Sequence, residues 1–95
     1  MEIKLLNKPL AGQYFHFLVT GGLKPIRIRA SVHGKTIFEE MCPDPPCHQK
    51  MTVPINANNS DIEIEVWDAA GIYEKQIVKV QTQDDTNSGG MTMGA

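Results

Sequence analysis

The sequence lacks an apolar run long enough to cross a bilayer, and it carries little net charge. Its longest apolar stretch, Tyr14 to Val19, is interrupted by His16 and is far shorter than the roughly eighteen residues that a spanning helix needs. The net charge of the 95 residues is −2, so no strong overall field attracts nucleic acid or an anionic membrane surface. We therefore expect no membrane span and no nucleic-acid partner.

Cysteine is also scarce. Two cysteines are too few for a disulfide scaffold, and they leave the redox compartment open. The N-terminal residues 1–7 contain no basic segment followed by a long apolar region, so we expect no secretory signal. This favours a location in the cytoplasm or within an assembled particle or complex.

Catalytic motifs are missing from the sequence. It contains no Gly-x-Ser-x-Gly, no phosphate-binding Gly-rich loop and no His-Glu-x-x-His, which would indicate particular reaction classes. Ser31, Ser60 and Ser88 have no histidine and acid arranged near them in the sequence. A chain of this length forms one domain with one modest core, which leaves little room for a substrate pocket. We predict that the protein is not an enzyme.

What the sequence does contain is alternation with period two. In 26–32 and 61–67, apolar residues alternate with polar or charged ones, which is typical of strands with one buried and one wet face. Five further strand-like stretches, separated by Gly, Pro and Asn turns, cover residues 2–6, 13–20, 35–40, 50–55 and 72–80. The pattern predicts an all-β, seven-stranded antiparallel β-sandwich over residues 1–81, followed by a flexible tail over 82–95.

The last predicted hairpin is Trp67-Asp68-Ala69-Ala70-Gly71 with its flanking strands. Seven short strands ending in this hairpin resemble the immunoglobulin-like β-sandwich superfamily in its bacterial, cysteine-independent variety. The resemblance covers about Glu2 to Val80 and implies an immunoglobulin-like fold. The paired cysteines of antibody domains would lie on two facing strands, whereas both cysteines here share one loop.

A narrower resemblance lies in the second half of the chain. The strings His33-Gly34-Lys35-Thr36-Ile37-Phe38-Glu39, Glu63-Ile64-Glu65-Val66-Trp67-Asp68 and Gly71-Ile72-Tyr73-Glu74 are similar in order to the small immunoglobulin-like subunit of the thiosulfate-oxidising sulfur carrier complex. This resemblance implies a non-catalytic subunit that helps to hold a carrier protein. The cysteine loop has no counterpart in that pattern.

The cysteine loop, from Cys42 to His48, contains Pro43, Pro45 and Pro46. It has three open interpretations. The thiols are plain structural residues, or they form a disulfide, which requires Cα atoms within about 7 Å. Alternatively, Cys42, Cys47 and His48 bind copper or zinc. A zinc site would need a further ligand such as His16 or His33, and adjacent Cys47 and His48 point opposite ways in an extended segment. No cofactor is expected unless this metal site forms.

A basic strand and a tryptophan are the remaining candidates. Arg27 and Arg29 share one wet face, and Asp61, Glu63 and Glu65 occupy the wet face of another strand. Cross-strand ion pairs between the two strands are favoured over an anion-binding patch. Trp67 falls out of phase with the apolar positions before it. Unless a bulge turns it inward, it is expected to face away from the core. It would then serve as an interface anchor, or its ring would lie over Lys or Arg stems.

Together these features predict a non-enzymatic interaction or structural module that acts as a subunit of a larger assembly with a protein partner. The predicted interface consists of Trp67, Arg27, Arg29, Met91 and Met93. The alternatives are a small redox or metal-binding carrier that uses the cysteine loop, and a partner subunit of a sulfur carrier complex.

Overall fold

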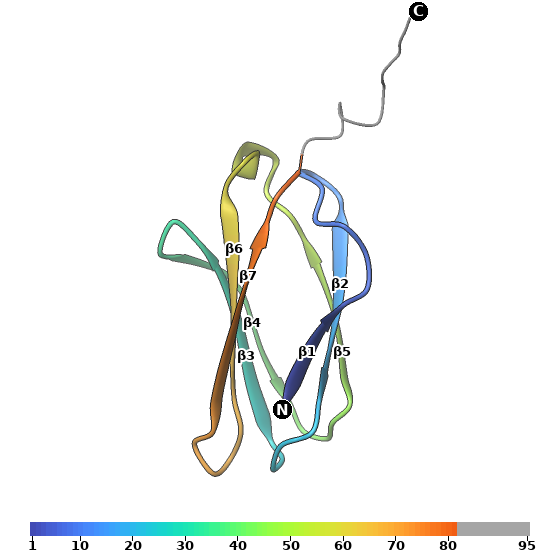
Figure 1. Ribbon diagram of the computed structural model, residues 1–95, viewed down its shortest axis with the longest axis vertical. Coiled ribbons are helices and arrows are strands. Elements are labelled where there is room, and N and C mark those ends of the chain that lie inside the picture. The colour runs from blue at the N-terminus through green and yellow to red at the C-terminus, as the bar shows by residue number, and fades with distance from the viewer. Residues whose placement is uncertain (82–95) are drawn as a thin grey trace, which may run out of the picture.

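The computed structural model describes residues 1–81 of the 95-residue chain. They form seven antiparallel strands and one 3-10 turn, arranged as two facing sheets (Figure 1). The elements are β1 (Glu2–Leu5), β2 (Tyr14–Thr20), β3 (Ile26–Val32), β4 (Lys35–Cys42), β5 (Cys47–Thr52), η1 (Ile55–Ala57), β6 (Asp61–Trp67) and β7 (Tyr73–Lys79). Within residues 1–81, no helix is long and apolar enough to traverse a membrane.

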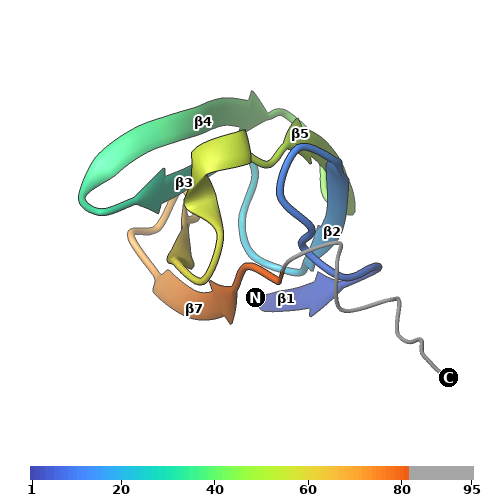
Figure 2. The same ribbon diagram turned by 90° about the horizontal axis from the view of Figure 1, so that it is seen from above.

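The seven strands divide three to four between the sheets. One sheet has the order β1-β2-β5 and the other β4-β3-β6-β7, and the view from above separates the two layers (Figure 2). This confirms the predicted seven-stranded antiparallel sandwich. β4 is an edge strand of the four-stranded sheet and β5 is an edge strand of the three-stranded sheet. The two lie on the same side of the sandwich (Figure 2).

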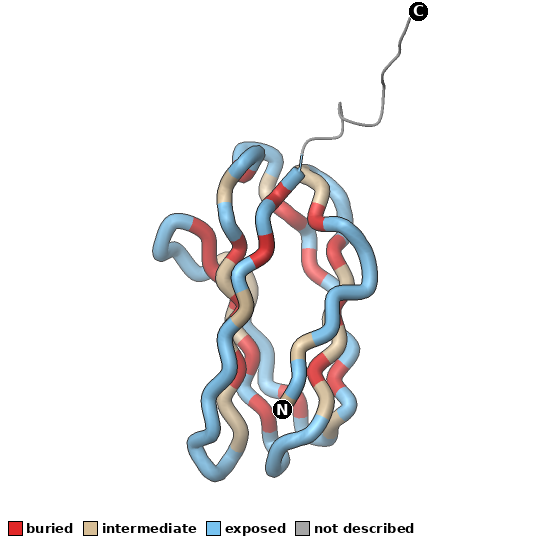
Figure 3. Tube along the Cα trace, viewed as in Figure 1, coloured by how far each residue is buried: buried red, intermediate tan, exposed pale blue. Residues whose placement is uncertain are grey.

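The core lies between the sheets because the period-two pattern turns every second side chain inward. Buried positions alternate with intermediate or exposed ones along β2 and β6 (Figure 3). In β3 the alternation holds up to Ala30, after which Ser31 and Val32 are both buried. The largest fully buried side chains include Phe15, Phe17, Ile28, Ile62 and Ile64. Each such side chain contributes about 1.5–3 kcal/mol by leaving water, and this burial holds the two sheets together.

Two links close opposite corners of the sandwich. At one corner, a disulfide joins Cys42, the last residue of β4, to Cys47, the first residue of β5. At the other, Leu10 forms a parallel bridge with Gln81, and the Gln81 N–H donates to the Pro9 carbonyl at 2.9 Å. The corner links restrain sheet edges that the hydrophobic core alone does not connect.

The predicted strand boundaries differ from the structure mainly around the cysteine loop. The fourth strand extends to Cys42 rather than ending at Glu40, and the fifth begins at Cys47 rather than at Lys50. The irregular segment is therefore only residues 43–46. The prolines predicted a longer loop. In the structure, residues 41–42 pair with β3 and residues 47–49 pair with β2, so both flanks of the loop belong to the sheets.

Candidate functional site

The outer face of the β4-β3-β6-β7 sheet carries a cluster of aromatic and charged side chains, which we call the Trp67 face. It comprises Arg27 and Arg29 on β3, Glu65 and Trp67 on β6, and Tyr73 on β7. The register places Arg27 opposite Trp67, Arg29 opposite Glu65, and Trp67 opposite Tyr73. Directly opposed residues of antiparallel strands share a face, so pairing alone assembles the cluster.

Trp67 lies at the centre of this face and is half-buried. The guanidinium carbons of Arg27 and Arg29 lie 5.0 and 5.2 Å from its ring centroid. The Tyr73 ring packs beside it at 5.4 Å between centroids. Cation–π contacts at exposed sites are worth about 0.5–1 kcal/mol each, so the two arginines and the tyrosine hold the indole in one position. The expected outward orientation of Trp67, with its ring against arginine side chains, is confirmed.

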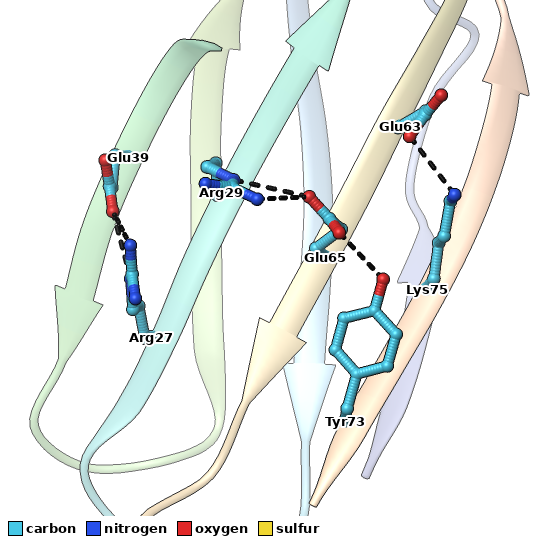
Figure 4. Close-up of polar contacts among 7 residues, drawn as sticks. All are labelled: Arg27, Arg29, Glu39, Glu63, Glu65, Tyr73 and Lys75. Carbon is cyan, nitrogen blue, oxygen red and sulfur yellow. Dashed lines mark hydrogen bonds and ion pairs between the residues drawn. The ribbon is translucent and has the colours of Figure 1, made fainter. Parts of the chain in front are cut away.

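Glu65 is the polar hub of the face (Figure 4). Its Oε1 accepts hydrogen bonds from Arg29 Nη2 at 2.9 Å and Nε at 3.3 Å, and its Oε2 accepts from the Tyr73 hydroxyl at 2.7 Å. The Tyr73 hydroxyl, followed by the Arg29 side chain, lowers the pKa of Glu65 below its ordinary value. The same hydrogen bond raises the pKa of Tyr73. Glu65 is therefore held as a carboxylate that fixes its two neighbours.

Further ion pairs flank the cluster (Figure 4). Arg27 Nη2 lies 2.9 Å from Glu39 Oε2, and Lys75 Nζ lies 3.2 Å from Glu63 Oε1. The hydrogen bond to Glu63 raises the pKa of Lys75. Both arginines of the face are thus paired with a carboxylate, and the predicted cross-strand neutralisation is confirmed for Arg29. Arg27 takes its partner from β4 instead.

Asp68 fixes the hairpin that carries the cluster. Its carboxylate accepts backbone N–H bonds from Leu23 at 3.0 Å, Ala70 at 3.0 Å and Ile72 at 2.9 Å. These donors, Leu23 first, lower the pKa of Asp68. One side chain therefore holds both the β6–β7 turn and the neighbouring β2–β3 loop, and the spacing between Trp67 and Tyr73 follows from this turn.

No family model, curated protein or solved structure compared with this chain matches it. The function therefore has to be inferred from the geometry of its own residues.

The cysteine loop does not form the predicted metal ligand set. Cys42 and Cys47 are bonded to each other with their Cα atoms 6.1 Å apart, so neither sulfur is a free thiolate, which is the form that binds metals. His48 points to the opposite face of β5 from the buried Cys47 and lies near His16. Within residues 1–81, no three His, Cys, Asp or Glu side chains converge.

Folding also brings together a serine and a histidine that are separated in the sequence. Ser60 Oγ lies 2.8 Å from His33 Nε2. His33 and Gly34 form the β3–β4 turn with φ values of 54° and 77°, as a two-residue hairpin turn of type I′ requires. Among the hydrogen bonds of residues 1–81, none joins this ring to a carboxylate. The contact braces one loop against another.

Sequence reasoning placed Arg27, Arg29 and Trp67 correctly on one exposed face but missed Tyr73 and Glu39. Counting outward positions across the Asp68 turn would have found Tyr73, because it lies opposite Trp67 in the hairpin register. Glu39 could not be paired with Arg27 before the neighbour of β3 was known. The predicted interface residues Met91 and Met93 lie outside the described residues.

Proposed function

We propose that this chain is a non-enzymatic binding module that acts as a subunit of a larger assembly and docks a protein partner through the Trp67 face. The observation that carries the proposal is the half-buried Trp67 ring, held between two arginines and a tyrosine at the end of the four-stranded sheet. Trp, Tyr and Arg are the residue types enriched among interface hot spots.

The face is organised before a partner arrives. Arg29, Glu65 and the Tyr73 hydroxyl are already joined by hydrogen bonds, and Arg27 is bonded to Glu39. The indole lies between the arginines of β3 and the tyrosine of β7. Binding therefore immobilises few additional rotamers, which otherwise oppose association by about 0.5–1.5 kcal/mol for each long side chain. Exposed apolar side chains border the cluster on both sides: Met41 opposite Arg27, and Ile77 opposite Glu63.

The size of the face indicates how much more surface a partner needs. Four strands of seven or eight residues, spaced by about 4.8 Å and rising about 3.3 Å per residue, give a flat area of roughly 440 Å². A standard interface takes about 800 Å² from each partner. The adjoining 21–25 and 68–72 loops supply the nearest additional surface, and they carry the exposed apolar residues Leu23 and Ile72.

The disulfide fits a structural role better than a carrier role. Cys47 and Cys42 are 2% and 9% exposed, and thiol exchange requires a sulfur that another thiol can reach. Disulfides persist where thiols are not kept reduced, so we propose that the module works in such a compartment or particle rather than in a reducing cytoplasm.

Site-specific photo-crosslinking in the native host tests the docking face. A photoreactive residue at Ile77, which borders the Trp67 face on the same side of the sheet, is expected to give a defined protein adduct. The same residue at Lys50, on the outer face of the other sheet, serves as the matched control. Trp67→Ala is expected to abolish the Ile77 adduct while the circular dichroism spectrum stays unchanged.

Adducts from Lys50 alone, or an Ile77 adduct that persists in Trp67→Ala, would contradict the proposal. Mass spectrometry of the adduct also tests the narrower resemblance. A thiol-bearing carrier protein as the captured partner would support the prediction of a sulfur carrier subunit.

A further inference from the structure

Two histidines lie side by side on the outer face of the β1-β2-β5 sheet, away from the Trp67 face. His16 is on β2 and His48 is on β5, and the register pairs His16 with Lys50 and Leu18 with His48. The histidines are thus diagonal neighbours on one face, within reach of long side chains. His16 Nδ1 lies 3.3 Å from His48 Nε2, with 5.4 Å between ring centroids.

We propose that His16 and His48 bind a divalent transition-metal ion. Two Zn–N bonds of 2.0–2.1 Å at a tetrahedral angle place their nitrogens about 3.3 Å apart, which is the separation found here. Imidazole nitrogen is a preferred ligand of zinc, copper and nickel. His48 is exposed and His16 is half-buried, so an ion can reach both nitrogens from solvent.

The backbone holds the pair in place. β2 is the central strand of its sheet, and the His16 N–H donates to Asn7 Oδ1 at 2.7 Å while its carbonyl accepts from the Leu6 N–H at 3.0 Å. Two lysines lie on the same face: Lys50 opposite His16, and Lys4 opposite Leu18. The Lys50 ammonium is directed at the Tyr14 ring, 4.4 Å from its centroid. The two imidazoles therefore stand on strands whose positions the sheet already fixes.

The site supplies two protein ligands. Within residues 1–81, no third His, Cys, Asp or Glu joins the pair, so water or a donor from another molecule takes the remaining positions. Because the ligand atoms are imidazole nitrogens, we expect binding of Cu²⁺, Ni²⁺ and Zn²⁺, and none of Mg²⁺ or Ca²⁺, which require oxygen ligands. Of the ligands considered from the sequence, this set keeps His48 and the possible further ligand His16, and it leaves out Cys42 and Cys47.

Calorimetric titration of the full oxidised chain with zinc chloride at neutral pH tests the site. His16→Gln and His48→Gln are each expected to weaken zinc binding roughly tenfold or more, because each removes one of two ligands. His33→Gln is the matched control, since His33 is also exposed and hydrogen-bonded, to Ser60 at 2.8 Å. It is expected to leave zinc binding unchanged, and magnesium is expected not to compete.

Nuclear magnetic resonance with substoichiometric Cu²⁺ locates the ion independently of affinity. Paramagnetic broadening centred on the signals of His16 and His48 supports the site. The proposal would be overturned if His16→Gln left zinc binding intact, or if His33→Gln lost as much binding as the two ligand variants. Broadening centred on Asp84 and Asp85, the two adjacent acidic residues near the end of the sequence, would also overturn it. Circular dichroism of each variant shows whether the fold is retained, and the Trp67 face is untouched by all three substitutions.

Discussion

Reducing the disulfide between Cys42 and Cys47 isolates the contribution of a covalent link between the two sheets. The closed loop runs over six residues, for which the chain-entropy relation gives about 7 cal/mol/K, or about 2 kcal/mol at 25 °C. Pro43, Pro45 and Pro46 already restrict the unfolded loop, so the cross-link removes less freedom than the relation assumes. We expect reduction to lower the free energy of unfolding by about 1–2 kcal/mol.

Urea unfolding with and without reductant measures this difference, with fluorescence of the single tryptophan as the probe. For a small domain with a slope near 1 kcal/mol per molar urea, the midpoint should fall by about 1–2 M. The doubly substituted variant Cys42→Ala/Cys47→Ala is the control, because its midpoint should not respond to reductant. Circular dichroism of the reduced protein should still show the β-sandwich.

Two results would refute this reasoning. Complete unfolding on reduction would mean that the cross-link, rather than the packed core, supports the fold. A midpoint that reductant leaves unchanged would mean that the prolines alone already order the loop, and the entropy relation would not apply to it.

Three further predictions concern the sheet face, the core and the turns. The folded-state pKa of Glu65 lies below its ordinary 4.5, so its carboxylate stabilises the fold above that pH, and this contribution is lost as pH falls through the lowered value. Glu65→Gln should therefore unfold at a lower urea concentration at neutral pH, and its stability should fall less steeply than that of the wild type below pH 4.5. As the control, Asp44→Asn at an exposed ion pair should stay within about 0.5 kcal/mol of the wild type. Phe17→Ala removes a fully buried ring that packs against two other phenylalanines, and calorimetric unfolding should report a loss of about 3–5 kcal/mol; a loss below 1 kcal/mol would contradict the core. Gly22→Ala and Gly34→Ala both place a side chain at positive φ, which should lower the free energy of unfolding by about 1–2 kcal/mol each. Only at Gly22 would the new Cβ also meet the Met1 side chain, at 2.6 Å. Gly22→Ala should therefore have the lower melting temperature of the two.

The sequence alone determined the strands and the orientation of their side chains. Alternation with period two in 26–32 and 61–67 assigned Ile28 and Ile64 to the core and Arg29 and Trp67 to the outer face, and the structure agrees. This information is local, because successive side chains of an extended chain point to opposite sides whatever the strand pairs with.

The tertiary structure alone decided which outward side chains meet and what the cysteines do. Arg27 pairs with Glu39 because β4 lies beside β3, and His16 meets His48 because β5 lies beside β2. The disulfide depends on two edge strands of different sheets ending within bonding distance. Each of these outcomes depends on the order of strands within the sheets, which joins residues far apart in the chain and leaves no periodic trace in the sequence.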